Sequence, residues 1–314
     1  MRRLSGYIVR RLLFAVVLVF AVSSVSLLLV RLAPGDYATT ALGQQSISTE
    51  AIARARERYG LNRSFGAQYR DWLAGAMRFD FGQSMQYDRP VTDLIPERAK
   101  NTAILALTAL VIATLVGLPL GVFTGTRRDG VLPSVVRGVS LLLLSMPPLL
   151  TSLFLVFLAA KSRLLPVGGM TSSSGEGLIS HMIVPVGALA LPLIAMFERL
   201  QSQAMGETIG QPFVLATFGR GVPLSRVIWR DALKNALKPI VSIYGLIVGT
   251  LLSGSFAVET VTAWPGLGQL MLNALRARDV YLVAGCAAAG AVFLAIGTLV
   301  SDAALACVDP RAAE

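Results

Sequence analysis

The stretch that decides the fold is residues 101–126, NTAILALTALVIATLVGLPLGVFTGT, which contains no charged side chain. A bilayer core about 30 Å thick is crossed by about 20 apolar residues in a helix, so this stretch is long enough to span a membrane. The rest of the chain has the same character, since 54% of its 314 residues are hydrophobic and only 15% are charged. This composition argues against an ordinary soluble domain.

Five further charge-free stretches of similar length predict five more spans, and the fold class expected is an all-α membrane protein with six transmembrane helices. A shorter apolar stretch at 260–275 is interrupted by WPGLG and is predicted to be a loop or a re-entrant element. The basic run before the first span resembles a signal peptide, but the apolar run is too long and lacks a cleavage pattern, so a retained helix is expected. The other expected spans are 12–30, 138–160, 177–197, 239–258 and 280–305, the last of which is charge-free from 280 to 301.

Lysine and arginine positions predict the orientation of these spans. Short basic segments favour the cytoplasmic side, whereas long loops largely escape this rule. Both termini, 1–11 and 306–314, are therefore expected in the cytoplasm, together with the loop at 198–238. The extracytoplasmic loops are then 31–100, which is long and helical, and 259–279. Membrane topology explains the net charge of +10 more simply than nucleic-acid binding, and no nucleic-acid module is present.

One polar, basic segment interrupts this apolar chain at 213–223, FVLATFGRGVP, and continues to 239. Its pattern predicts a short helix, a glycine turn and a second amphipathic helix. Such a segment facing the cytoplasm favours a docking site for a soluble partner. The chain has no G-x-x-x-x-G-K-[ST] phosphate loop, so any energy from ATP has to come from that partner.

Inside the predicted spans, small residues and prolines stand out. Gly117, Gly121 and Gly125 recur at every fourth position, which favours a close contact between helices. Proline pairs at 147–148 and at 185 and 192 favour kinks or breaks. In the long loop, helices are expected from Ser48 to about 58 and from 66 to about 77.

Groups able to perform catalysis or bind a metal are scarce. His181 is the only histidine, and without companions it is more simply a helix-end residue than a metal ligand. An intramembrane hydrolase built from His181 with Ser253 or Ser255 is a remote alternative. An ion-coupled secondary transporter is a second one, but it predicts internal repeats and paired intramembrane charges that the sequence does not show.

The chain resembles, over essentially its whole length, the B-type permease subunit of dipeptide, oligopeptide and nickel ABC importers, which have a type I, MetI-like permease fold. Each matching motif is short, but their order and spacing together are specific. The motifs are RLAPGD at 31–36, FGQS at 81–84, NT at 101–102, GLPLGV at 117–122, LPVGG at 165–169, DALKNALKP at 231–239, VETV at 258–261, WPGLG at 264–268 and DPR at 309–311.

The resemblance assigns roles to two sets of residues. The cytoplasmic segment matches the "EAA" signature that docks on the ATPase, although Pro212, Leu215 and Phe218 replace its usual charged residues. The apolar Phe213 and Val214 are expected to anchor there, and Gly221 is expected to permit a turn that a side chain would obstruct. The coupling residues are Phe213, Val214, Ala216, Thr217, Gly219, Arg220 and Gly221. The residues expected to face a binding protein are Glu259, Trp264, Pro265, Gly266 and Gly268.

The resemblance also implies the assembly and its chemistry. A second homologous permease, two ATP-binding-cassette subunits and an extracytoplasmic substrate-binding protein are expected as partners in the bacterial inner membrane. This chain is expected to be a transport subunit and not an enzyme, with no cofactor of its own, since ATP and magnesium belong to the ATPases. Di- or oligopeptides are the expected cargo, with nickel, glutathione or another small solute as alternatives.

Overall fold

The structure is a computed structural model that describes residues 2–32, 37, 49–127, 129–170 and 177–308. The predicted helix start at Ser48 and the motif at 309–311 lie outside the described residues, as does most of the motif at 31–36. The chain divides into two compact units. Unit 1 comprises Met1–Thr102 and Pro265–Ala295, and unit 2 comprises Ala103–Trp264 and Ile296–Glu314.

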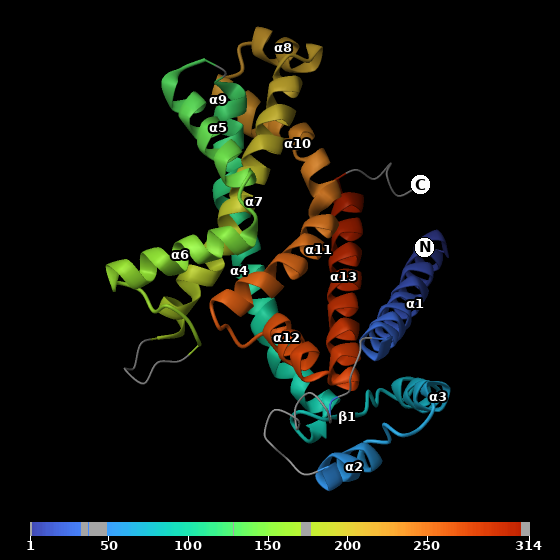
Figure 1. The fold of residues 1–314 in the computed structure, drawn as a ribbon. Coiled ribbons are helices and arrows are strands. Elements are labelled where there is room, and N and C mark those ends of the chain that lie inside the picture. The colour runs from blue at the N-terminus through green and yellow to red at the C-terminus, as the bar shows by residue number, and fades with distance from the viewer. Residues whose placement is uncertain (1, 33–36, 38–48, 128, 171–176, 309–314) are drawn as a thin grey trace. The chain divides into compact units, whose positions relative to one another are not determined.

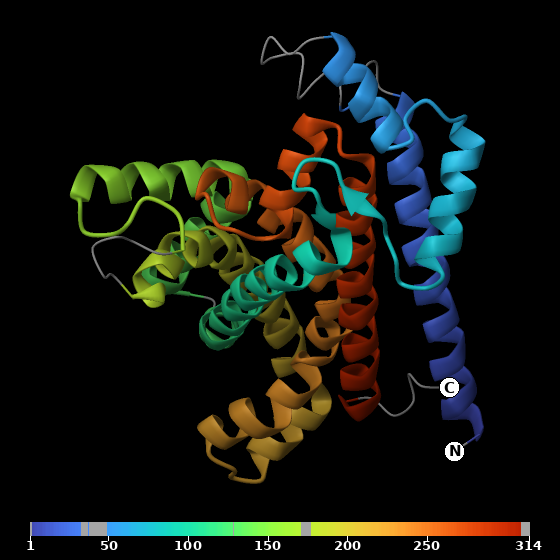
Figure 2. The same ribbon diagram turned by 90° about the horizontal axis from the view of Figure 1, so that it is seen from below.

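Long apolar helices dominate the chain, as the sequence predicts (Figure 1). Four helices in the described part are long and apolar enough to cross a membrane: α1 (Arg2–Leu32), α4 (Val91–Thr126), α7 (Leu178–Ile209) and α13 (Val280–Val308). The number rises to six if each of two bent helix pairs is a single span. Figure 2 shows α13 as one unbroken ribbon. The expectation of an all-α membrane protein is confirmed.

The stretch expected to form the third span is divided in two. Helix α5 (Val131–Leu144) and helix α6 (Pro148–Ser162) meet at an angle of 106°. Pro147 is extended at φ −65° and ψ 151°, and Pro148 begins α6, where its missing N–H costs nothing. The paired prolines therefore explain why the chain turns sharply here instead of forming one helix from 138 to 160.

The prolines of α7 act differently. Pro185 and Pro192 lie inside a helix that remains continuous for 32 residues.

Helix α11 (Lys238–Val261) contains the second bent pair, with an angle of 50° between Lys238–Gly249 and Gly254–Val261. Proline therefore predicts a possible break, but the neighbouring sequence decides whether the helix stops.

Unit 2 contains the close helix contact that the glycine repeat predicts. A Cβ atom added to Gly117 would lie 2.7 Å from the Cβ of Phe197, and one added to Gly121 would lie 2.5 Å from the Cβ of Gln201. At Gly125 the nearest atom would be the carbonyl oxygen of Ser202, also at 2.5 Å. These distances are too short for any side chain, so α4 and α7 approach through their backbones. The helix contact is confirmed.

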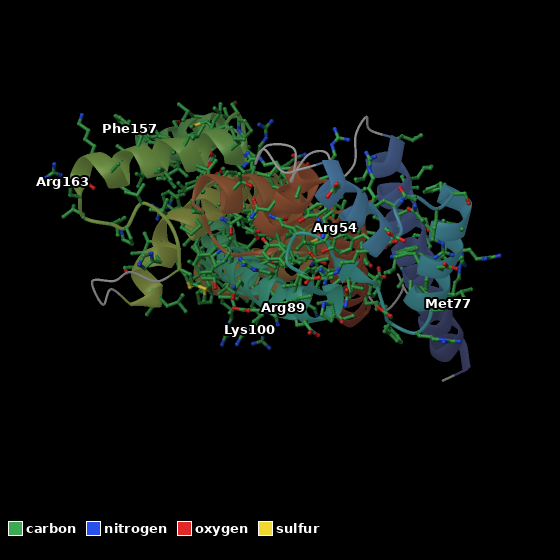
Figure 3. All side chains as sticks on the ribbon, turned by 60° about the horizontal axis from the view of Figure 1, so that its bottom comes forward. Arg54, Met77, Arg89, Lys100, Phe157 and Arg163 are labelled. Atoms are coloured by element: carbon green, nitrogen blue, oxygen red, sulfur yellow. The ribbon has the colours of Figure 1, made fainter. Side chains whose placement is uncertain are left out.

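Unit 1 contains the short elements that follow α1. They are α2 (Thr49–Arg58), α3 (Phe65–Ala76) and two short antiparallel strands, β1 (Gln83–Ser84) and β2 (Arg89–Pro90). Helix α3 confirms the helix expected from 66 to about 77, and its Trp72 is buried beside Tyr69 and Leu73. Arg89 of β2 and Lys100 of α4, which are both labelled in Figure 3, are exposed.

Candidate coupling segment and candidate binding-protein surface

The segment predicted to dock a partner folds as the sequence indicates. Helix α8 (Pro212–Gly219) is followed by a turn, then α9 (Leu224–Arg226), the π-helical η3 (Val227–Ala232) and α10 (Leu233–Ala236). Pro212 lies in the first turn of α8, where proline fits the helix. The helix, turn and helix order is therefore confirmed as local structure.

Gly221 makes the turn possible through its backbone. Its φ is +80°, a left-handed value that residues with a Cβ rarely adopt, and its N–H donates a 2.9 Å hydrogen bond to the carbonyl oxygen of Phe218. A Cβ at this position would meet no atom within 4 Å. The constraint at this turn therefore comes from φ and not from space, so a residue with a Cβ is strained at position 221, as expected.

The surface of α8 is apolar. Phe213, Leu215 and Phe218 expose 39%, 57% and 55% of their area. The remaining polar groups are used locally, since the Thr217 hydroxyl donates to the carbonyl oxygen of Phe213 at 2.9 Å and the Arg220 guanidinium donates to Thr217 at 3.3 Å. Exposed apolar side chains at this density favour burial against another protein.

Val214 does not belong to that surface. It is 4% exposed and packs in a core cluster with Val122, Met205 and Val227. Its neighbours Ala216 and Gly219 on the same helix are exposed. The expectation that Val214 anchors in a partner's pocket is therefore wrong, because it already holds α8 onto its own chain.

The second predicted set, expected in a loop at 259–279, is mostly buried, and its first member, Glu259, lies within α11. Glu259 and Trp264 are 0% and 1% exposed, and the Trp264 N–H donates to the Glu259 carbonyl oxygen at 2.9 Å. Gly266 and Gly268 are buried as well. These residues shape the loop from within, so they do not themselves offer a surface to a binding protein.

In unit 1, Pro265 and the residues after it connect to the start of α4. The Asn101 amide donates to the carbonyl oxygen of Pro265 at 2.9 Å, and the N–H of Leu267 donates to the Thr102 hydroxyl at 2.8 Å. Helix α12 (Leu267–Ala277) follows, within the stretch that was expected to be a loop or a re-entrant element. The signal was present in the sequence, since the buried Leu267, Leu270 and Ala274 lie at helical spacing.

A buried carboxylate in unit 1 was missed by sequence reasoning. Asp279 is 0% exposed and precedes α13, where its Oδ1 accepts a 3.1 Å hydrogen bond from the N–H of Leu282. Its Oδ2 accepts hydrogen bonds from the Ser84 hydroxyl at 2.6 Å and from the Gln86 N–H at 3.0 Å. Burial raises the pKa of Asp279, and the hydrogen bond from Ser84 is the largest of the effects that lower it. This carboxylate fastens the strand segment to the beginning of α13.

The residues considered for a hydrolase gain no support. The Ser255 hydroxyl donates to the carbonyl oxygen of Leu252 in its own helix at 2.9 Å, as hydroxyls in membrane helices commonly do. His181 is buried in the first turn of α7. Among the described residues, no three His, Cys, Asp or Glu side chains are grouped to hold a metal ion.

Two family models match consecutive parts of the chain. Residues 117–314 match a family described as the binding-protein-dependent transport system inner membrane component, and residues 4–106 match its N-terminal region. The oligopeptide transport system permease protein AppB of Bacillus subtilis is 30% identical over 98% of this chain and 99% of its own length. DppB, a dipeptide transport system permease protein of Escherichia coli, and OppB, an oligopeptide transport system permease protein of Salmonella typhimurium, are each 30% identical over 97% of this chain and 98% of their own.

Proposed function

Because the chain belongs to the family of binding-protein-dependent transport system inner membrane components, we propose that it forms half of a pathway through which an ATP-driven importer takes up short peptides. It is a multi-pass membrane transport subunit of an ABC importer and not an enzyme. The observation that carries the peptide assignment is the full-length similarity to permeases named for dipeptide and oligopeptide transport.

The expected partners supply the other half of the pathway and the ATP-binding sites that this chain does not contain. With four candidate spans, or six if each bent pair is one span, the chain supplies one side of a pathway, and a second homologous permease completes it. The sequence has no phosphate loop, so ATP and magnesium bind to two separate ATPase subunits. A substrate-binding protein delivers peptides from the other side of the membrane.

The basic residues support an orientation with both termini in the cytoplasm. The coupling segment then faces the cytoplasm, and the elements after the first span face the binding protein. In this arrangement the exposed Phe213, Leu215 and Phe218 fit an apolar cleft on an ATPase subunit. Closure of the ATPases around ATP moves the segment, which opens the paired permeases outward.

The first experiment tests coupling through Gly221. We expect Gly221→Val to lower substrate-stimulated ATP hydrolysis at least several-fold in the reconstituted complex, because valine disfavours φ +80° and shifts Phe218. Gly138→Val is the matched control, since Gly138 also has open space around it but no positive φ. Coupling that is equal in Gly221→Val, Gly138→Val and the unmodified complex would refute the role of this segment.

The second experiment tests the cargo. ATP hydrolysis by the reconstituted complex is measured with its binding protein and with di-, tri- and longer peptides. We expect stimulation only when both binding protein and peptide are present. Stimulation by a non-peptide solute, with none by any peptide, would overturn the peptide assignment and leave the permease assignment intact.

A further inference from the structure

Unit 2 contains a cavity of about 400 Å³ between α4, α5 and α7. It lies toward the carboxyl ends of α4 and α7, of which the end of α7 leads into the coupling segment, and Thr124 is two residues from the end of α4. Glu198 lies 11 residues before the end of α7, or about 16 Å at the helical rise. The volume is within the range of small-molecule sites and far above that of one water molecule. The lining includes Thr124, Arg137, Ser140, Glu198, Arg199 and Ser202.

Glu198 is the unusual member of this lining. It is 1% exposed, and in the described part of the chain its only hydrogen bond is the one donated by the Thr124 hydroxyl at 2.5 Å. No described lysine or arginine forms an ion pair with it. A carboxylate accepts about four hydrogen bonds, so most of its capacity faces the cavity unused. Burying a carboxylate without an ion pair and with few hydrogen bonds is costly, which makes Glu198 a candidate for a functional role.

The rest of the lining adds the opposite charge. Arg137 of α5 and Arg199 of α7 both line the cavity, as do Ser140 and Ser202. The cavity therefore offers a deep carboxylate together with guanidinium groups. A ligand that complements both carries an ammonium and a carboxylate on one small molecule. An anionic lipid headgroup fits the arginines but is repelled by Glu198.

We infer that this cavity is an inner subsite for a short zwitterionic peptide, with Glu198 holding its ammonium group and Arg137 and Arg199 facing its carboxylate. This inference rests on the proposed function, since the ligand is the imported peptide on its way out of the pathway. The Thr124 hydroxyl orients the Glu198 carboxylate from the neighbouring helix.

The test measures equilibrium binding of labelled Ala-Ala to the complete importer in nanodiscs, without its binding protein. N-acetyl-Ala-Ala lacks the ammonium group, and Ala-Ala amide lacks the carboxylate. We expect Ala-Ala to bind the unmodified complex at least tenfold more tightly than either analogue. Glu198→Gln should weaken Ala-Ala binding at least tenfold and leave the binding of N-acetyl-Ala-Ala unchanged. Glu97→Gln, which removes an exposed charge near the other end of α4, should change neither.

Three results would overturn the inference: no Ala-Ala binding, equal binding of the acetylated peptide, or equal binding to Glu198→Gln. The comparison between ligands needs no variant, so it decides the question even if Glu198→Gln fails to assemble.

Displacement of Ala-Ala by anionic lipid vesicles but not by free dipeptides would assign the cavity to lipid instead. ATP-driven uptake of Ala-Ala by the unmodified complex is measured in parallel. If uptake occurs without these binding differences, the subsite fails and the proposed function stands.

Discussion

Two buried carboxylates, Asp279 in unit 1 and Glu198 in unit 2, have opposite surroundings. Asp279 accepts hydrogen bonds from Ser84, Gln86 and Leu282 and fastens the strand segment to the beginning of α13. Glu198 accepts one hydrogen bond, from Thr124, and borders a cavity. Both are at most 1% exposed, so burial alone does not separate them. The number of hydrogen bonds that each carboxylate accepts does separate them. A carboxylate whose oxygens accept several hydrogen bonds stabilises the fold, whereas one that accepts a single hydrogen bond beside a cavity is available to a ligand.

The largest effect is expected from removing the satisfied carboxylate. Asp279→Ala leaves the buried donors of Ser84, Gln86 and Leu282 without their acceptor, which costs about 3–5 kcal/mol of unfolding free energy. Hydrogen exchange should increase in residues 83–87 and in the first turn of α13. The exposed Glu97→Ala is the control and should leave exchange unchanged. Equal protection in both variants would remove the structural role of Asp279.

A smaller effect separates the two sites by deleting one hydroxyl from each. Ser84→Ala removes a donor in a closed cluster and should cost about 2 kcal/mol, whereas Thr124→Val should cost about 1 kcal/mol or less, because water in the cavity replaces the lost hydrogen bond. Thermal unfolding of the two purified variants provides the comparison. A loss for Thr124→Val that exceeds that for Ser84→Ala would contradict the open nature of the Glu198 site.

The smallest effect is a dependence on pH in unit 1. Burial raises the pKa of Asp279 above its ordinary value of 3.8, so the folded state keeps its proton to a higher pH than the unfolded chain does. The stability from this group is therefore fully present below pH 3.8 and falls as the pH rises from there through the folded-state pKa. Hydrogen exchange in residues 83–87 should increase over that window. Asp279→Asn, which does not titrate, should abolish the dependence, and the same slope in both proteins would contradict the assignment.

Sequence patterns predicted the parts of the molecule that depend on local spacing. Charge-free length predicts the spans, and glycines at every fourth position predict the backbone contact of α4 with α7. The helix, glycine turn and helix of the coupling segment follow from the same kind of local signal. Each of these features is encoded by residues that are close together in the chain.

The missed features depend on contacts between residues far apart. Asp279 is next to Ser84 only in the folded chain, 195 positions away, and Glu198 meets Thr124 from another helix. Val214 looks like a docking residue in sequence because nothing local shows that Val122 and Met205 bury it. The paired prolines also marked a break between α5 and α6 without indicating its angle of 106°.

The central claim is that ATP bound by partner subunits drives uptake through this chain. The most direct measurement is uptake of labelled Ala-Ala into proteoliposomes that contain the complete importer, with the binding protein outside and ATP inside. Uptake should require both, stop when the ATP is replaced by a non-hydrolysable analogue, and persist when ion gradients are collapsed. Uptake that continues without ATP and follows a proton or sodium gradient would contradict the account.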